Sequence, residues 1–356
     1  MAERAHRWPG VPLALASSLL FGASVPFAKL LLGITDPWLL AGLLYLGAGL
    51  GLSLVSLGRR KLGLPPPEAP IRRSDLPLLM VVILIGGAAG PLLLMLGLAR
   101  TEAASASLLL NLENLATMGL AWLVFGENVD RRLLIGAFSI VAGAALLSWQ
   151  GQGVSLNPGA LLIMAACFAW AIDNNLTRKL SGADPVLIAL IKGWVAGIIN
   201  LILSMTFGAR LPVGAAIPAA MLIGFLGYGL SLVLFVLGLR HLGAARTGAY
   251  FSSAPFIGAL LAVVLLGEEL SPRLLLAGAL MGIGLLLHLL ERHEHEHTHD
   301  PIEHEHRHIH DAHHQHRHEP GISLKEPHSH WHKHERLVHR HPHYPDLHHQ
   351  HGHRPE

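Results

Sequence analysis

The feature that most constrains the fold of this chain is a succession of apolar segments, each about long enough to cross a lipid bilayer. A membrane-spanning helix needs about 20 consecutive, mostly apolar residues. Ten such segments follow one another, at residues 10–32, 37–58, 75–97, 103–125, 132–149, 158–180, 186–207, 216–239, 244–266 and 272–290. They predict an all-α integral membrane protein with ten transmembrane helices in the lipid bilayer.

The composition agrees with this prediction and excludes several other classes. Only 14% of the residues are charged, against about 25% in a soluble domain. The single cysteine, Cys167, excludes an internal disulfide and a Cys-x-x-Cys site. The sequence has no nucleophile elbow, phosphate loop or closed metal site, so we expect neither an enzyme nor a required cofactor. The formal charge of +2 gives no reason to expect a nucleic-acid partner.

The loops between the apolar segments set the orientation in the membrane. If the N-terminus is cytoplasmic, the cytoplasmic segments hold thirteen Lys and Arg residues and the outer segments three. Cytoplasmic loops of membrane proteins carry this excess, and ten spans return the C-terminus to the same side. We therefore expect a multi-pass protein of the bacterial inner membrane with both termini in the cytoplasm.

The two halves of the membrane region repeat each other. Asp36-Pro37 matches Asp184-Pro185, and each pair places a capping side chain before a proline at the first helical position. Residues 97–127 align without a gap on residues 238–268. Five spans per half is an odd number, so the second half is inverted relative to the first, as in many transporters whose site lies between the repeats. The predicted units are a first repeat (8–149), a second repeat (158–290) and a polar tail (291–356).

The chain resembles a drug/metabolite transporter of the EamA type. The resemblance rests on FGASVPFAKLL (21–31), ARTEAASASLLLNLEN (99–114), LVFGE (123–127) and LLGEELSPRLLLAGALMGIGLLL (265–287). It implies a ten-helix carrier that moves small metabolites or ions across the inner membrane, mostly outward, and some such proteins are associated with nickel and cobalt resistance. The family places a proline after the glutamate of its fourth helix, as Pro255 stands in the second half. Here that position is Asn114, so a polar side chain replaces the expected kink.

The fourth span contains a carboxylate in the middle of an apolar segment. Glu113 lies between Asn111 and Asn114, which share one helical face. A carboxylate at the centre of a membrane span costs about 2.5–3.5 kcal/mol on insertion scales, so such residues usually serve transport. We expect these three residues to offer oxygen ligands to a substrate or cation, and Glu113 to exchange a proton. The alternative is hydrogen bonding between helices.

A second polar group lies in the sixth span, where Trp170, Asp173 and Asn174 follow closely. The equivalent positions of the first half hold Val25 and Pro26 in place of Asp173 and Asn174, which favours a role in the substrate path. Lys192 in the next span is predicted to lie at a similar depth, about 10 Å from the inner surface. It either faces the substrate path or forms a buried ion pair with Asp173.

The tail holds 23 of the 26 histidines. Alternating His with Glu and Asp has no apolar period, so we expect the tail to be disordered. Imidazole is a common ligand of Ni²⁺, Co²⁺ and Zn²⁺, and histidine-rich tracts are typical of metal binding. Alternatively, the tail is a pH-sensitive polyelectrolyte or plain low-complexity sequence. The predicted metal ligands are His293, His295, His297, His299, His304, His306, His308, His310, His313, His314, His316 and His318.

Three functions follow from these patterns. The leading hypothesis is export of a divalent metal, Ni²⁺ or Co²⁺ and possibly Zn²⁺, in exchange for protons, by a monomer or homodimer. The second is export of metabolites or amino acids, with a pocket lined by Lys192, Trp170 and Tyr250 and a tail that senses metal or pH. The third is a membrane-anchored metal buffer or sensor that transports nothing.

Overall fold

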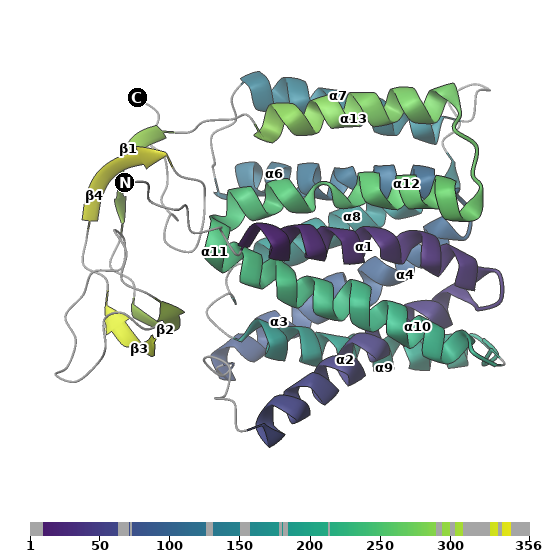
Figure 1. Cartoon of the computed structure of the whole chain (residues 1–356), viewed down its shortest axis with the longest axis horizontal. Helices are drawn as coiled ribbons and strands as arrows, with labels where there is room; N and C mark the ends of the chain where they lie inside the picture. Colours follow the sequence, from purple (N-terminus) through teal and green to yellow (C-terminus); the bar gives the residue numbers. More distant parts are fainter. Residues whose placement is uncertain are drawn as a thin grey trace, which may run out of the picture.

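The structure, a computed structural model, is a body of long helices that lie side by side with a histidine-rich segment after the last helix (Figure 1). It describes residues 10–62, 71, 73–125, 131–149, 157–177, 180, 184–212, 214–289, 294–299, 303–308, 328–333 and 337–342. For the last four of these ranges, and for a few helical residues, it describes the backbone alone.

The helices of the two repeats follow the apolar segments of the sequence. The first repeat contains α1 (Gly10–Leu32), α2 (Pro37–Lys61), η1 (Arg73–Asp75), α3 (Leu76–Val82), η2 (Ile83–Ala89), α4 (Gly90–Leu98), α5 (Ala103–Leu109), α6 (Asn111–Phe125) and α7 (Arg131–Ser148). The second contains α8 (Pro158–Thr177), α9 (Pro185–Thr206), α10 (Ala216–Gly224), η4 (Phe225–Leu230), α11 (Ser231–Phe251), α12 (Ala254–Leu266) and α13 (Pro272–Leu289).

The predicted Asp-Pro helix starts are confirmed. The Asp36 carboxylate accepts hydrogen bonds from the backbone N–H groups of Trp38, at 2.9 Å, and Leu39, at 3.4 Å. The Asp184 carboxylate accepts one from Val186, at 2.9 Å. These bonds satisfy N–H groups that have no partner within a helix.

Six stretches of the described residues are long and apolar enough to cross a membrane. They are Gly10–Leu32, Pro37–Lys61, Arg73–Leu98, Pro158–Thr177, Val186–Thr206 and Ala216–Gly238. Shorter apolar helices cover Leu134–Ser148, Ala254–Leu266 and Pro272–Leu287. The predicted total of ten spans stays a prediction.

The helix boundaries correct two details of the sequence analysis. The fourth predicted span is broken at Leu110, between α5 and α6, although it lacks the family's proline. The ninth is broken at Ser252–Ser253, and no break separates it from the eighth, because α11 runs on to Phe251. Leu110 and Phe251 are 141 positions apart, which is the offset between 97–127 and 238–268. The kink therefore belongs to the repeat and does not need the proline.

Each repeat also contains one π-helical segment at the same place. The segment η2 covers Ile83–Ala89, and η4 covers Phe225–Leu230. Gly86 and Gly227 are equivalent at the offset of 141 positions. A Cβ atom at Gly86 would collide with Asp173 of α8, and one at Gly227 would lie 2.6 Å from Cβ of Ser24 of α1. π-Helical turns leave the regular hydrogen-bonding pattern and are frequent at functional sites.

Packing between the repeats is pseudo-symmetric. Helix α2 packs on α9, and α7 on α13, so that equivalent helices contact each other. Gly143 of α7 faces Ala277 and Met281, while Gly284 of α13 faces the equivalent positions Gly136 and Ile140. These glycines let the helix backbones approach closely, as is typical of membrane helices.

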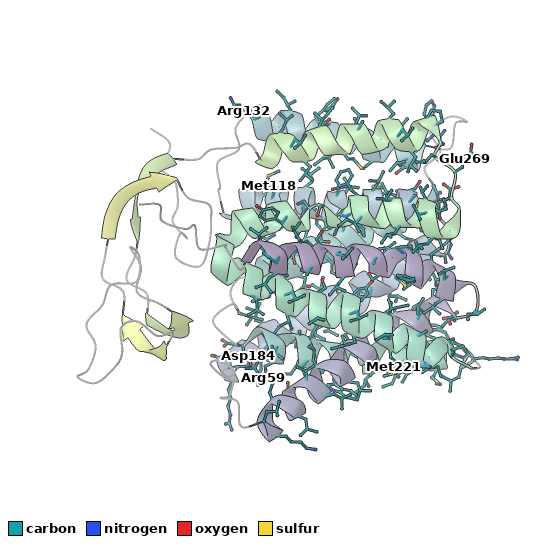
Figure 2. All side chains as sticks on the ribbon, in the orientation of Figure 1. Arg59, Met118, Arg132, Asp184, Met221 and Glu269 are labelled. Atoms are coloured by element: carbon teal, nitrogen blue, oxygen red, sulfur yellow. The ribbon has the colours of Figure 1, made fainter. Side chains whose placement is uncertain are left out.

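Charged side chains lie at both ends of the helical body. Figure 2 shows Arg59, Arg132 and Asp184 at one end and Glu269 at the other. Helix α1 begins, and α13 ends, at the end that carries the two arginines (Figures 1 and 2). This arrangement agrees with the distribution of Lys and Arg on which the predicted orientation was based.

Four short segments of the histidine-rich tail have an extended backbone. They are the strands β1 (Glu294–His299), β2 (Glu303–His308), β3 (His328–Lys333) and β4 (Leu337–Pro342). β1 pairs with β4 and β2 with β3, both antiparallel. The alternation of His with other residues has the two-residue period of a strand. The expectation that the tail is disordered stays a prediction.

Candidate substrate site

The pseudo-symmetry creates two equivalent interfaces between the repeats. In the first, α6 and η2 pack on α8, and η2 also packs on α9. In the second, α12 and η4 pack on α1, and η4 also packs on α2. We call them the charged interface and the uncharged interface, because Glu113, Asp173 and Lys192 lie in the first. Their equivalents in the second are Ala254, Val25 and Leu44.

Glu113 lies in the first turn of α6, directly after the break at Leu110. The N-terminus of a helix carries partial positive charge, and discontinuous membrane helices use such ends to bind anionic groups. The Glu113 carboxylate accepts a hydrogen bond of 2.9 Å from the side-chain amide of Asn174 on α8. The structure thus brings these two predicted site residues together.

Further amide contacts join α6 to α8 beside Glu113. The Asn174 amide also donates to the Thr117 hydroxyl at 3.4 Å, and the Asn175 amide donates to the Thr117 carbonyl at 3.0 Å. On the other side of the helix break, the Cys167 thiol of α8 donates to the carbonyl of Leu109, the last residue of α5, at 3.6 Å. Thr117 was not predicted as a site residue, because a single threonine in an apolar helix gives little signal in a sequence.

Asp173 and Lys192 form an ion pair between α8 and α9. Both are buried, with 4% of Asp173 and 8% of Lys192 exposed. The Thr177 hydroxyl donates a further hydrogen bond to the Asp173 carboxylate at 3.0 Å. Of the two alternatives for Lys192, pairing with Asp173 is therefore the one observed, and the two charges compensate each other.

Gly86 of η2 brings the backbone of the third span against this ion pair. Its carbonyl accepts hydrogen bonds from the Trp170 indole at 2.9 Å and from the Tyr45 hydroxyl at 3.4 Å. Tyr45 and Gly86 were missed in the sequence analysis. The Gly86-Gly87 pair within an apolar segment was the available signal, since glycine there indicates close approach of another group.

The other two predicted path residues point elsewhere. The amide of Asn111 donates to the carbonyl of Leu108 at 2.9 Å and contacts the sulfur of Met281 at 3.9 Å. The amide of Asn114 donates to the Ser252 hydroxyl at 3.0 Å. These hydrogen bonds lead away from Glu113, so the expected group of three converging oxygen ligands is not observed. All three residues lie in the first turn of α6, and the amides of Asn111 and Asn114 are taken up by Leu108 and Ser252 instead of facing α8 with Glu113.

The two interfaces differ in accessibility as well as in charge. Glu113 is half-buried and Asn174 is exposed. Their equivalents in the uncharged interface, Ala254 and Pro26, are both buried. The Glu113 and Asn174 side chains are therefore partly exposed, where the equivalent residues of the other interface are covered.

The predicted metal ligands of the tail fall where the structure gives no side-chain positions. His293, His310, His313, His314, His316 and His318 lie outside the described residues. His295, His297, His299, His304, His306 and His308 lie in β1 and β2, for which only the backbone is described. Among the side chains that the structure does describe, no three His, Cys, Asp or Glu residues are grouped closely enough to hold a metal ion.

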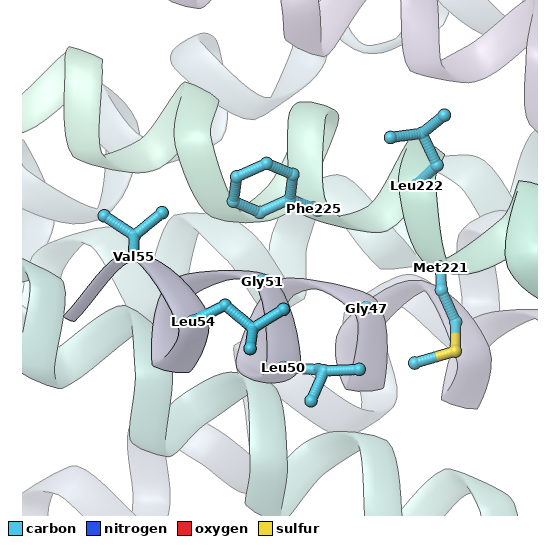
Figure 3. A pocket seen from close by; sticks show the side chains of 8 residues that line it. All are labelled: Gly47, Leu50, Gly51, Leu54, Val55, Met221, Leu222 and Phe225. Atoms are coloured by element: carbon cyan, nitrogen blue, oxygen red, sulfur yellow. The ribbon is translucent and has the colours of Figure 1, made fainter. Parts of the chain in front are cut away.

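A groove of about 460 Å³ lies elsewhere on the body, between α2 and the α10–η4 segment (Figure 3). Its lining is apolar throughout and consists of Gly47, Leu50, Gly51, Leu54, Val55, Met221, Leu222 and Phe225. It has no group that would recognise a polar substrate, so we do not assign the site to it.

Comparisons with known proteins agree on one transporter family and one fold. The sequence model of the EamA-like transporter family matches residues 8–149 and again 157–290. An uncharacterized transporter of Methanothermobacter thermautotrophicus is 29% identical over 290 residues, covering 76% of this chain and 83% of that protein. A probable terminal-alkyne amino-acid exporter of Streptantibioticus cattleyicolor is 26% identical over 247 residues, covering 67% of this chain and 83% of that protein. A crystal structure with 19% sequence identity aligns with a TM-score of 0.60 over 80% of this chain and 99% of its own, which shows a shared fold.

Proposed function

This chain belongs to the EamA-like transporter family, and on that premise we propose that it exports a small amino-acid-like metabolite. As a member of that family it is a membrane transporter of the efflux type and not an enzyme. The proposal places it in the bacterial inner membrane with ten spans and both termini in the cytoplasm. Two relatives support the substrate class: the protein of S. cattleyicolor is described as a probable terminal-alkyne amino-acid exporter, and one of Salmonella typhimurium as a probable amino-acid metabolite efflux pump.

The observation on which the proposal rests is the polar contact between two helices at the charged interface. The Asn174 amide on α8 donates to the Glu113 carboxylate on α6 at 2.9 Å, and neither side chain is fully buried. An ionisable group kept inside a membrane span marks a substrate or proton path by default. In inverted-repeat transporters the site lies at the interface of the repeats, and the repeats move against each other to expose it to either side.

In this proposal the charged interface binds the substrate, and Glu113 exchanges a proton during the cycle. Protons enter the cell down their gradient and compete with the substrate for the open site. The Asn174 amide holds the Glu113 carboxylate toward α8. A shift of α8 against α6 would break this contact, so the protonation of Glu113 is coupled to the movement of the repeats.

Uptake into inverted membrane vesicles tests the proposal directly. Labelled amino acids are offered with and without a proton gradient, and an uncoupler collapses the gradient in a parallel sample. We expect gradient-dependent uptake that Glu113→Gln lowers at least tenfold. Glu269→Gln is the matched control, because this exposed carboxylate lies at one end of the body (Figure 2). Absence of gradient-dependent uptake of every amino acid offered would contradict the proposal.

A second candidate function is export of Ni²⁺ or Co²⁺, with Zn²⁺ as a further possible cargo. The observation in its favour is the tail with 23 of the 26 histidines, whose imidazoles suit these metals. The same vesicles, offered labelled nickel from outside in place of amino acids, test it, and gradient-dependent uptake of nickel would support it. Restoration of nickel tolerance by the tail alone, fused to another membrane anchor, would instead support a buffer without transport.

A further inference from the structure

The Asp173–Lys192 ion pair is a buried pair of charges in the described interior. Both charges lie in segments that we place within the membrane, with 4% and 8% of the residue surfaces exposed. Removing two charges from water carries a penalty that their attraction does not always repay. Replacing a buried ion pair by apolar residues of similar volume is often neutral or stabilising.

The chain itself contains the apolar version of this site. At the equivalent positions of the uncharged interface, Val25 and Leu44 are buried with 1% and 0% exposed. Gly227 of η4 lies against α1 there, as Gly86 of η2 lies against α8 at the ion pair. The same helix geometry therefore packs without charges in one copy. The ion pair is not required by the fold, which points to a ligand.

The chemistry of the pair matches a ligand that carries one charge of each sign. A substrate ammonium group binds a carboxylate such as Asp173, and a substrate carboxylate binds an ammonium group such as Lys192. Such a ligand replaces one ion pair by two, so no buried charge loses its partner. A metal cation or a simple anion would leave one of the two protein charges unpaired.

Aromatic side chains adjoin the pair and indicate the rest of the ligand. Trp170 and Tyr45 both donate to the Gly86 carbonyl beside Asp173. The ring of Phe21 lies 6.3 Å from that of Trp170 and 6.0 Å from that of Tyr228, and the Tyr45 and Tyr228 rings are 5.4 Å apart. Aromatic rings in these arrangements favour apolar and aromatic groups.

We propose that the Asp173–Lys192 pair is the binding subsite for the ammonium and carboxylate groups of a zwitterionic amino acid. The apolar side chain of the amino acid packs against the aromatic cluster of Phe21, Tyr45, Trp170 and Tyr228. This inference rests on the proposed export function and adds the location of the substrate and its class.

The test uses the purified full-length protein and a double variant that copies the first repeat. Asp173→Val with Lys192→Leu gives the charged interface the residues of the uncharged one. Binding of phenylalanine is compared with binding of phenethylamine, which lacks the carboxylate, and of 3-phenylpropionate, which lacks the ammonium group. Thermal unfolding in detergent measures folding of each protein. Glu269→Gln serves as the matched control.

We expect the wild-type protein to bind phenylalanine at least tenfold more tightly than either analogue. The double variant is expected to unfold at the same or a higher temperature and to lose phenylalanine binding at least tenfold. Unchanged binding by the folded double variant would overturn the inference. Should the double variant not fold, equal binding of phenylalanine and its two analogues by the wild-type protein would overturn it equally.

The vesicle experiment separates the two proposals. Wild-type vesicles that take up amino acids, together with a double variant that takes them up equally well, would refute the subsite and leave the export function standing. Wild-type vesicles that take up no amino acid would refute the export function itself.

Discussion

The charged and the uncharged interface are two versions of one structural arrangement. Each is built from a broken helix, a π-helical segment with a glycine at its centre, and two neighbouring helices of the opposite repeat. One of them holds Glu113, Asp173 and Lys192, whereas the equivalent positions of the other hold Ala254, Val25 and Leu44. The two interfaces share one helix geometry although only one of them carries charges, so the geometry does not depend on the charges.

The helix breaks of the two interfaces have the same position in each repeat but are followed by different residues. The break at Leu110 precedes Glu113 and Asn114, while the equivalent break at Ser252–Ser253 precedes Ala254 and Pro255. Both copies interrupt the helix, but only the first places a carboxylate at the new helix N-terminus. The helix break is therefore a property of the repeat. Glu113 lies at the helix N-terminus that this break creates.

The largest expected effect is on stability after removal of one partner of the ion pair. Lys192→Leu copies Leu44 but leaves the Asp173 carboxylate buried without its ammonium partner. We expect a loss of about 3–5 kcal/mol in the free energy of unfolding, measured in detergent. Leu44→Met, the matched change in the uncharged interface, should cost less than about 1.5 kcal/mol. Equal losses in the two variants would show that the interfaces do not differ as described.

A smaller effect is expected at the glycines of the two π-helical segments. Gly86→Ala brings a methyl group against Asp173, and Gly227→Ala brings one against Ser24. Overpacking of this kind costs about 1–3 kcal/mol, and we expect similar losses for both variants. Transport per folded molecule should fall only for Gly86→Ala, because only that methyl group displaces a charged residue. A fall of equal size in both would assign the π-helical segments a role independent of the charges.

The pseudo-symmetry itself is tested by Gly143→Ala and Gly284→Ala. A Cβ atom at Gly143 would lie 2.9 Å from the Ala277 carbonyl oxygen, and one at Gly284 would lie 2.6 Å from the Gly136 carbonyl oxygen. We expect equal losses of about 1–2 kcal/mol in the free energy of unfolding, with no change in vesicle uptake per folded molecule. A neutral change at one glycine only would mean that α7 and α13 do not pack symmetrically.

The smallest expected effect concerns the hydrogen bond to the Gly86 carbonyl. Trp170→Phe removes the indole donor, whose bond to Gly86 measures 2.9 Å, but keeps an aromatic ring. We expect a loss of about 1 kcal/mol in stability, which is typical of one hydrogen bond, and phenylalanine binding weakened severalfold. Tyr228→Phe removes a buried hydroxyl that lies near the Ser24 side chain without a well-formed hydrogen bond among the described residues, and should cost less than Trp170→Phe. A greater loss for Tyr228→Phe than for Trp170→Phe would contradict this account of the cluster.

Much of the fold could be predicted, since hydropathy and helix capping act locally. The apolar segments gave the order of the helices, and Asp36 and Asp184 marked helix starts that the structure confirms. The break at Leu110 could not be predicted, because the residue type that usually signals it is absent. The extended segments of the tail give no apolar period in the sequence, because the residue that alternates in them is histidine.

The charged members of the candidate site could be picked out from the sequence, whereas Tyr45, Gly86 and Thr117 and the contacts between the residues were not. Glu113, Asp173 and Lys192 stand out in a sequence because charges are rare within membrane spans. Their partners are far apart along the chain: Glu113 binds Asn174, and Gly86 approaches Asp173. Such contacts depend on how the repeats pack, which the order of residues in one segment does not encode.

By itself, the sequence determined that the chain is a membrane protein made of two related halves, and that a few charges are retained among apolar residues. The reason is that transfer into a bilayer and helix capping depend on each segment alone. Helix packing is what pairs Asp173 with Lys192, leaves Glu113 partly exposed beside Asn174, and buries the uncharged Val25, Leu44 and Ala254 at the equivalent positions. These outcomes depend on which helix faces share one interface, and that is fixed by the close packing of the two repeats.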